Sequence, residues 1–105
     1  MPTSFDEREK GFEKQFAHDE ELRFKAVARR NKMLGLWAAG VLGKSGADAE
    51  AYAKDVLLAE FDTGGDEAIV RKLANDLAGK TTEEQIRTQM SSLLAQALAQ
   101  VKQTG

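Results

Sequence analysis

Apolar positions recur at helical spacing in four stretches of the chain, and short glycine-containing segments separate the stretches. The predicted helices run from about Ser4 to Leu42, Ala47 to Phe61, Asp66 to Ala78, and Thr82 to Val101. No stretch alternates apolar and polar residues in the way that strands do. Connections of only a few residues favour antiparallel packing of consecutive helices. The pattern therefore predicts an all-α fold, a four-helix bundle with an unusually long first helix.

Several residues inside and beside these helices predict local geometry. Thr82 with Gln85, or alternatively Thr81 with Glu84, has the spacing of a capping box at the start of the last helix. In the first helix, Gly35 and Gly40 lack a side chain and are expected to permit the close approach of a second helix. Trp37 lies between them and is expected to belong to the core.

The first predicted helix is too long for the other three to cover. It would extend about 57 Å at about 1.5 Å per residue, and its two halves differ in composition. The second half is dense in apolar residues and is expected to supply the core with Phe24, Val27, Ala28, Met33, Leu34, Leu36, Trp37, Ala38, Val41 and Leu42. The first half is highly charged. We therefore expect residues 1–20 to form a partner-binding arm and residues 21–105 to form the helical bundle.

Three phenylalanines in the predicted arm lie at helical spacing. Phe5, Phe12 and Phe16 fall within about 40° of one another on a helical wheel. A stripe this narrow cannot hold an isolated helix together in water. The arm is therefore expected to be mobile or extended when free and helical in a partner's groove. The candidate partner-binding residues are Phe5, Asp6, Glu7, Arg8, Glu9, Lys10, Phe12, Glu13, Lys14 and Phe16. The same stripe could instead fold back into the core or pair with a second copy of the chain.

The run Ser4–Glu9, followed by Phe12–Asp19, resembles the N-terminus of the ζ subunit, the F1-ATPase inhibitor of α-proteobacteria. The stretch Leu34–Gly40, continuing to Gly43–Gly46, and the stretch Val70–Ala74 are similar to the same family. The similarity extends across the whole chain.

This resemblance implies a four-helix bundle with a mobile inhibitory segment within about Met1–Ala17. In the family, this segment enters the interface between the catalytic subunits and the rotor, and it inhibits hydrolysis more than synthesis. Carried over, Phe5, Phe12 and Phe16 become the anchors, and the charges around them set the register. The implied partners are the catalytic subunits and the rotor subunit of F1-ATPase. The implied location is the cytoplasm, peripheral to the inner membrane through ATP synthase, with a monomer as the free state.

Composition excludes several other classes of function. Fifteen basic residues against seventeen acidic ones, interleaved along the chain, argue against a nucleic-acid partner. The absence of cysteine excludes thiolate catalysis and cysteine-ligated metals. The longest mainly apolar stretch, Met33–Leu42, is far below the roughly 20 residues that span a bilayer, so no direct membrane insertion is expected. With one histidine and no convergent carboxylates, the chain is predicted to be neither an enzyme nor a metal protein.

Two weaker candidates remain open. His18, beside three acidic residues, could sense pH. Gly43, Lys44 and Ser45 resemble the end of a phosphate-binding loop, but Ala38 stands where that motif requires glycine, and the segment follows a helix rather than a strand. A phosphate contact there would make ADP or ATP a regulatory ligand; otherwise the segment is a solvated turn. The alternatives to an inhibitor are thus a nucleotide-responsive regulatory bundle and a homodimeric structural bundle.

Overall fold

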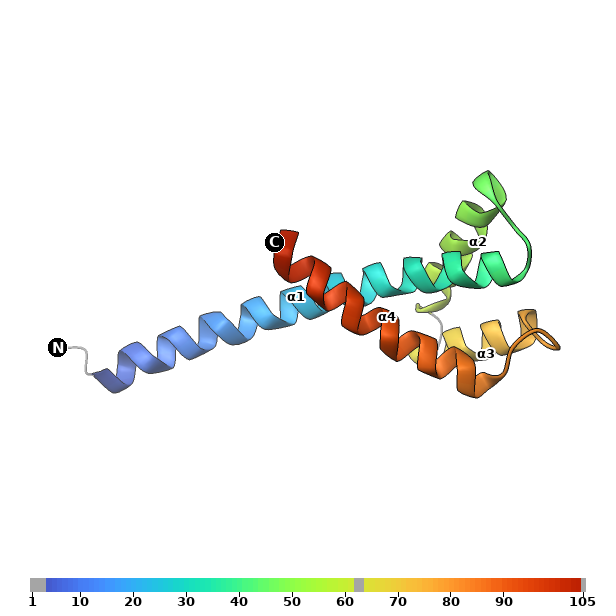
Figure 1. Cartoon of the computed structure of the whole chain (residues 1–105). Coiled ribbons are helices and arrows are strands. Elements are labelled where there is room, and N and C mark those ends of the chain that lie inside the picture. The colour runs from blue at the N-terminus through green and yellow to red at the C-terminus, as the bar shows by residue number, and fades with distance from the viewer. Residues whose placement is uncertain (1–3, 62–63, 105) are drawn as a thin grey trace.

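The computed structural model describes the backbone of residues 4–61 and 64–104 and the side chains of residues 20–61 and 64–103. It consists of four helices, α1 (Ser4–Val41), α2 (Gly46–Ala59), α3 (Asp66–Asp76) and α4 (Glu83–Thr104) (Figure 1). Within these residues there is no strand. The all-α fold with four helices and a long α1 is therefore confirmed, with helix ends within about three residues of those predicted. The mobility predicted for the start of α1 is not tested and stays a prediction.

The long helix α1 is the element on which the others assemble. It packs most extensively against α2 and α4, and α3 closes the structure against α4 and α2 (Figure 1). The main core joins all four helices through Leu34, Ala38, Ala39, Tyr52, Val56, Ala59, Ile69, Val70, Leu73, Leu77, Ile86, Met90 and Leu93. A separate second cluster joins α1 to the C-terminal half of α4 through Leu22, Ala26, Ala97 and Val101. The buried residues thus form two groups along α1, and partly buried Met33 packs against both.

The apolar positions that recur at helical spacing in α2, α3 and α4 form faces that the structure largely buries. Tyr52 and Val56 on α2, Leu73 on α3, and Ile86 and Val101 on α4 are all at most 9% exposed. Helical spacing sufficed there because each of these helices has one covered face.

The expected core face of α1 was partly wrong. Phe24 is 79% exposed, Ala28 is exposed, and Leu36 lies at the border of the exposed class. Leu22 and Ala26 pack toward α4 instead. Phe24 is two residues from each of them, about 200° around the helix, and therefore faces the opposite side. Trp37 packs against the main core while remaining partly exposed.

The predicted capping box is present at the start of α4. The Gln85 amide donates to Thr82 Oγ1 at 3.1 Å, and the Thr82 amide donates to Gln85 Oε1 at 3.1 Å. Two backbone donors of this helix end are thereby satisfied by the pairing of Thr82 with Gln85 rather than that of Thr81 with Glu84.

Only one of the two α1 glycines marks a close helix approach. A Cβ on Gly35 would lie 2.6 Å from Ala53 Cα, so α2 crosses α1 there at a distance that excludes any side chain. A Cβ on Gly40 would meet nothing within 4 Å, so the approach predicted there was wrong. In the part of the chain that the structure covers, no helix is both long and apolar enough to cross a membrane.

Candidate functional site

The residues predicted to bind a partner all belong to the first part of α1. The side chains from Phe5 to Phe16, and that of His18, lie outside the described residues, so their assignment stays a prediction. The described part of this site is its base, which begins at Glu20. The base determines how the bundle holds the helix that carries the candidate residues.

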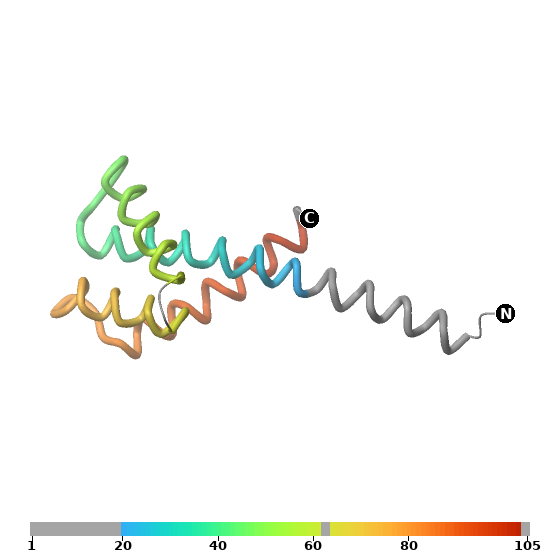
Figure 2. Tube along the Cα trace, turned by 180° about the vertical axis from the view of Figure 1, so that it is seen from behind, coloured from blue at the N-terminus to red at the C-terminus, as the bar shows by residue number. Residues whose placement is uncertain are grey.

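The second cluster fixes the base of α1 to α4. Leu22 is 9% exposed and Ala26 is fully buried, and both belong to this cluster with Ala97 and Val101. Figure 2 shows the C-terminal half of α4 crossing α1 near the first coloured turns of α1. At the surface of the same contact, Arg29 Nη1 donates to Gln100 Oε1 at 3.4 Å. The C-terminal half of α4 therefore packs on α1 directly beside the predicted arm.

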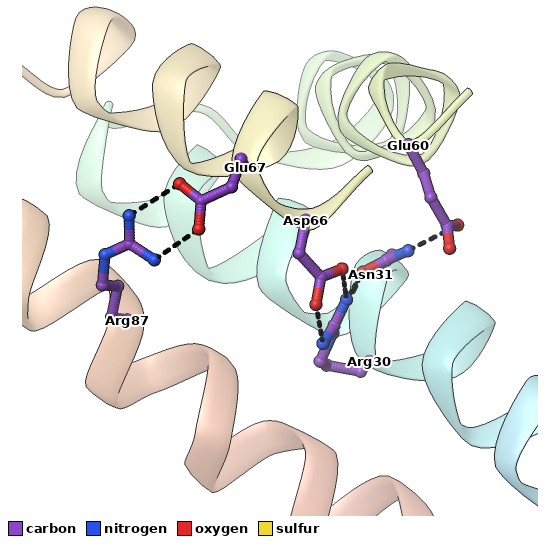
Figure 3. Close-up of polar contacts among 6 residues, drawn as sticks. All are labelled: Arg30, Asn31, Glu60, Asp66, Glu67 and Arg87. Carbon is purple, nitrogen blue, oxygen red and sulfur yellow. Dashed lines mark hydrogen bonds and ion pairs between the residues drawn. The ribbon is translucent and has the colours of Figure 1, made fainter. Parts of the chain in front are cut away.

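A buried polar network fixes α1 one to two turns further along (Figure 3). Arg30 is 3% exposed, and its guanidinium donates to Asp66 Oδ1 at 2.7 Å and to Asn31 Oδ1 at 2.8 Å. The fully buried Asn31 donates from Nδ2 to Glu60 Oε2 at 2.7 Å. Glu60 follows the last residue of α2, and Asp66 begins α3. The network thus attaches both ends of the α2–α3 connection to α1.

Sequence reasoning missed this network because charged and amide side chains are expected on the surface. A signal was present: Arg30 lies four residues before the fully buried Leu34, and hence on the same helical face. A buried arginine is tolerated when its charge is paired and its donors are occupied. Arg30 and Asn31 hold α1 in place rather than offer a reactive group.

Two further ion-pair groups link the other helices to one another. Arg87 on α4 donates to both carboxylate oxygens of Glu67 on α3, at 2.9 and 2.8 Å (Figure 3). Arg87 also donates to Glu83 at 2.9 Å. Hydrogen bonds from Arg87 lower the pKa of Glu67, and the two carboxylates raise the pKa of Arg87. All three groups are exposed, so water screens this attraction and it orients α3 on α4 more than it stabilises them.

On α2 and α3, Tyr52 donates to Asp76 Oδ2 at 2.9 Å, and Lys72 Nζ lies 3.0 Å from the same oxygen. Burial and the hydrogen bond to Asp76 raise the pKa of Tyr52. For Asp76, burial alone would raise the pKa, but the hydrogen bonds from Lys72 and Tyr52 outweigh it and lower the pKa. This trio joins α2 to α3 and keeps the Asp76 carboxylate charged.

The segment Gly43–Ser45, the weak phosphate candidate, forms the exposed turn between α1 and α2. The amides of Gly43 and Lys44 donate to the carbonyls of Gly40 and Ala39, at 3.0 and 2.8 Å. Both amides thus end α1 and are not offered to a ligand. Asp48 adds a negative charge to the first turn of α2, where a phosphate would need a positive one. The phosphate contact stays a prediction, and this geometry gives it little support.

Two large aromatic side chains of the bundle remain open to solvent. Phe24 on α1 is 79% exposed, and Phe61, two residues after the end of α2, is 80% exposed. They provide exposed aromatic positions within the bundle for comparison with the phenylalanines of the predicted arm.

Comparison with known proteins agrees with this architecture. A structure solved by NMR in solution is 48% identical, covers 80% of this chain and 99% of its own, and superposes with a TM-score of 0.72. No curated protein matches the chain. The family model described as ATPase inhibitor subunit zeta matches residues 1–100, which confirms the resemblance seen in the sequence. With nearly its whole length matched, this chain belongs to the ATPase inhibitor subunit zeta family, a family of regulatory proteins rather than enzymes.

Proposed function

We propose that this protein inhibits ATP hydrolysis by F1-type ATP synthase through residues 1–20, while residues 21–105 form the bundle that carries this arm. Membership of the zeta family supports inhibition of an F-type ATPase in general. The proposal adds the segment responsible and the place where it acts, the catalytic interface beside the rotor. The protein would act in the cytoplasm as a monomer that attaches to membrane-bound ATP synthase.

The observation that carries this proposal is the relation between the two halves of α1. At about 100° per residue, positions 5, 12 and 16 share a helical face, within about 40°, with positions 30 and 34. Arg30 and Leu34 are buried in the bundle, at 3% and 0% exposure. By sequence periodicity, the three phenylalanines lie on the side of α1 that the bundle buries at Arg30 and Leu34, whereas α1 is buried on another side at Leu22 and Ala26. An aromatic stripe on this side needs a protein cover.

The bundle's own helices are too short to supply that cover along the arm. Val101 on α4 packs in the same cluster as Leu22 on α1, and α4 ends three residues later, at Thr104. From Leu22 back to Phe5, α1 extends 17 residues, which is about 25 Å. A groove on another protein is the simplest cover for an aromatic stripe at that distance.

Insertion of this helix at a rotating interface would inhibit without chemistry. Three buried phenylalanines contribute roughly 5–9 kcal/mol before the cost of ordering the arm. The surrounding charges, such as Glu7, Arg8 and Lys10, fix the register by complementing charges of the partner. An occupied interface cannot reach the geometry of the next rotational step, so hydrolysis stops while the active-site residues stay intact.

The test is ATP hydrolysis by F1-ATPase titrated with the protein and its variants. Phe5→Ala, Phe12→Ala and Phe16→Ala combined should abolish inhibition and leave the helical circular dichroism of the bundle nearly unchanged. The matched control is Phe24→Ala with Phe61→Ala, which removes exposed aromatics of the bundle and should retain inhibition. If the triple variant inhibits as strongly as the wild type, the three phenylalanines are not the anchors of the arm.

The homodimeric alternative is separated by sedimentation of the full chain against a chain that lacks residues 1–19. The proposal predicts a monomer in both cases. A dimer that dissociates on truncation would instead assign the phenylalanine stripe to self-association.

A further inference from the structure

The buried residues of this protein form two clusters of unequal size. The main core contains buried residues from all four helices. The second cluster contains only four buried residues, two of them alanines, and it joins only α1 and α4. Partly buried Met33, Leu94 and Leu98 pack against it. Its particular effect is to hold α1 in place eight residues before Arg30.

Without the second cluster, the network of Arg30 and Asn31 would be the first firm attachment of α1. Those two side chains are buried and bonded to Asp66 and Glu60. The turns between Leu22 and Arg29 would then depend on helix propensity, on the exposed hydrogen bond from Arg29 to Gln100 at 3.4 Å, and on the exposed Glu21–Lys25 pair, whose N–O distance is 3.4 Å. An exposed pair at that spacing adds little to a helix.

Helix formation has a costly first turn and easy later ones. Nucleation carries a factor on the order of 10⁻³, whereas each further residue is close to neutral. A helical arm that continues from a turn already held by tertiary packing needs no nucleation step of its own. The closer that turn lies to the arm, the fewer residues the partner must order on binding.

We propose that the second cluster is a positioning site: α4 holds the turn of α1 at Leu22 and Ala26 as the helical nucleus from which the inhibitory arm extends into F1-ATPase. This inference rests on the proposed function of the arm. Leu22, Ala26, Ala97 and Val101 act through α1 and touch no partner.

The test compares Leu22→Ala with two substitutions in the main core. One should lower the free energy of unfolding less than Leu22→Ala does, and the other should lower it more. Leu22→Ala leaves every residue of the predicted arm unchanged. It should raise the amide exchange of residues 22–29, leave that of α3 unchanged, and weaken inhibition of ATP hydrolysis about tenfold. Ile69→Val and Leu77→Ala, at fully buried sites of the main core, should destabilise the protein and leave inhibition unchanged at a temperature where both are folded.

A conservative variant separates positioning from general loss of packing. Leu22→Met keeps a similar volume and should restore both slow exchange at residues 22–29 and wild-type inhibition. The inference is overturned if Leu22→Ala speeds exchange there and still inhibits fully, or if Ile69→Val and Leu77→Ala weaken inhibition equally. The triple phenylalanine variant in the same assay reports on the arm itself, so failure of the proposed function remains distinguishable from failure of this inference.

Discussion

The crossing of α1 and α2 offers a direct test of how closely the two helices pack. Gly35 and Gly40 lie in the same helix, five residues apart, and the helical dihedral angles of both positions suit alanine. Only Gly35 faces another backbone. The same substitution should therefore have opposite effects at the two positions.

The magnitude follows from the distance at the crossing. A Cβ on Gly35 would lie 2.6 Å from Ala53 Cα and 3.2 Å from the Ala53 carbonyl oxygen. Ordinary contact needs about 1 Å more, and α2 can supply it only by moving as a body, because the atoms in the way are backbone. Such a movement loosens the packing of Tyr52 and Val56 in the main core. Overpacking of this kind costs about 1–3 kcal/mol or more, which exceeds the gain of up to about 1 kcal/mol in helix propensity.

Gly40→Ala brings the propensity gain without the clash, because its Cβ would meet nothing within 4 Å. It should raise the free energy of unfolding by about 0.5–1 kcal/mol. Urea unfolding followed by the fluorescence of Trp37, the one tryptophan of the chain, measures both variants against the wild type. The reasoning is refuted if Gly35→Ala is as stable as the wild type, or if the two variants change stability in the same direction.

Three further substitutions test other contacts. Arg30→Ala should lower the free energy of unfolding by about 2–4 kcal/mol, since it leaves the buried side chain of Asn31 without its donor; a loss below about 1 kcal/mol in urea unfolding would contradict this. Thr82→Ala should cost about 1 kcal/mol through loss of the capping box, while Thr88→Ala, at an exposed site in the middle of α4, should cost less in the same assay. The pKa of Asp76 is lowered in the folded protein, so the stability it contributes is complete above its ordinary pKa of 3.8 and is lost as the pH falls through the folded pKa. Asp76→Asn should accordingly lose less stability than the wild type on acidification, and equal losses would show that this carboxylate is not linked to folding.

Periodicity predicted the four helices because each short helix has one covered face and a clear end. The stripes on α2, α3 and α4 are buried, and the Thr82–Gln85 cap is present. The same reasoning failed on α1 because this helix is covered from different sides along its length. Leu22 faces α4, whereas Gly35 faces α2, so no single stripe describes the buried face.

The polar network could not be predicted because its partners come from distant segments. Arg30 and Glu60 are ordinary surface residues by type, and only the folded chain brings Asp66 to Arg30 and Glu60 to Asn31. The Gly40 prediction failed for a related reason. A glycine in α1 makes a close approach of another helix possible, but the path of α2 decides at which glycine the approach occurs.

For the functional site, the sequence supplied the family and the candidate arm, and the structure adds the way in which the bundle holds the arm's base. The family match confirms an ATPase inhibitor, while the anchoring phenylalanines rest on periodicity alone. The binding face of such a helix is buried only in the complex with another protein, so the fold of the free chain does not identify it.

Site-specific photocrosslinking tests the central claim most directly. A photoreactive amino acid would replace Phe12 in one variant and Phe61 in another, and each would be irradiated with F1-ATPase in the presence of ATP. The account predicts that position 12 crosslinks to a catalytic subunit or the rotor in parallel with loss of hydrolysis, and that position 61, exposed on the bundle, does not. Crosslinks from position 61 alone, with hydrolysis blocked, would show that the bundle and not the arm stops the enzyme.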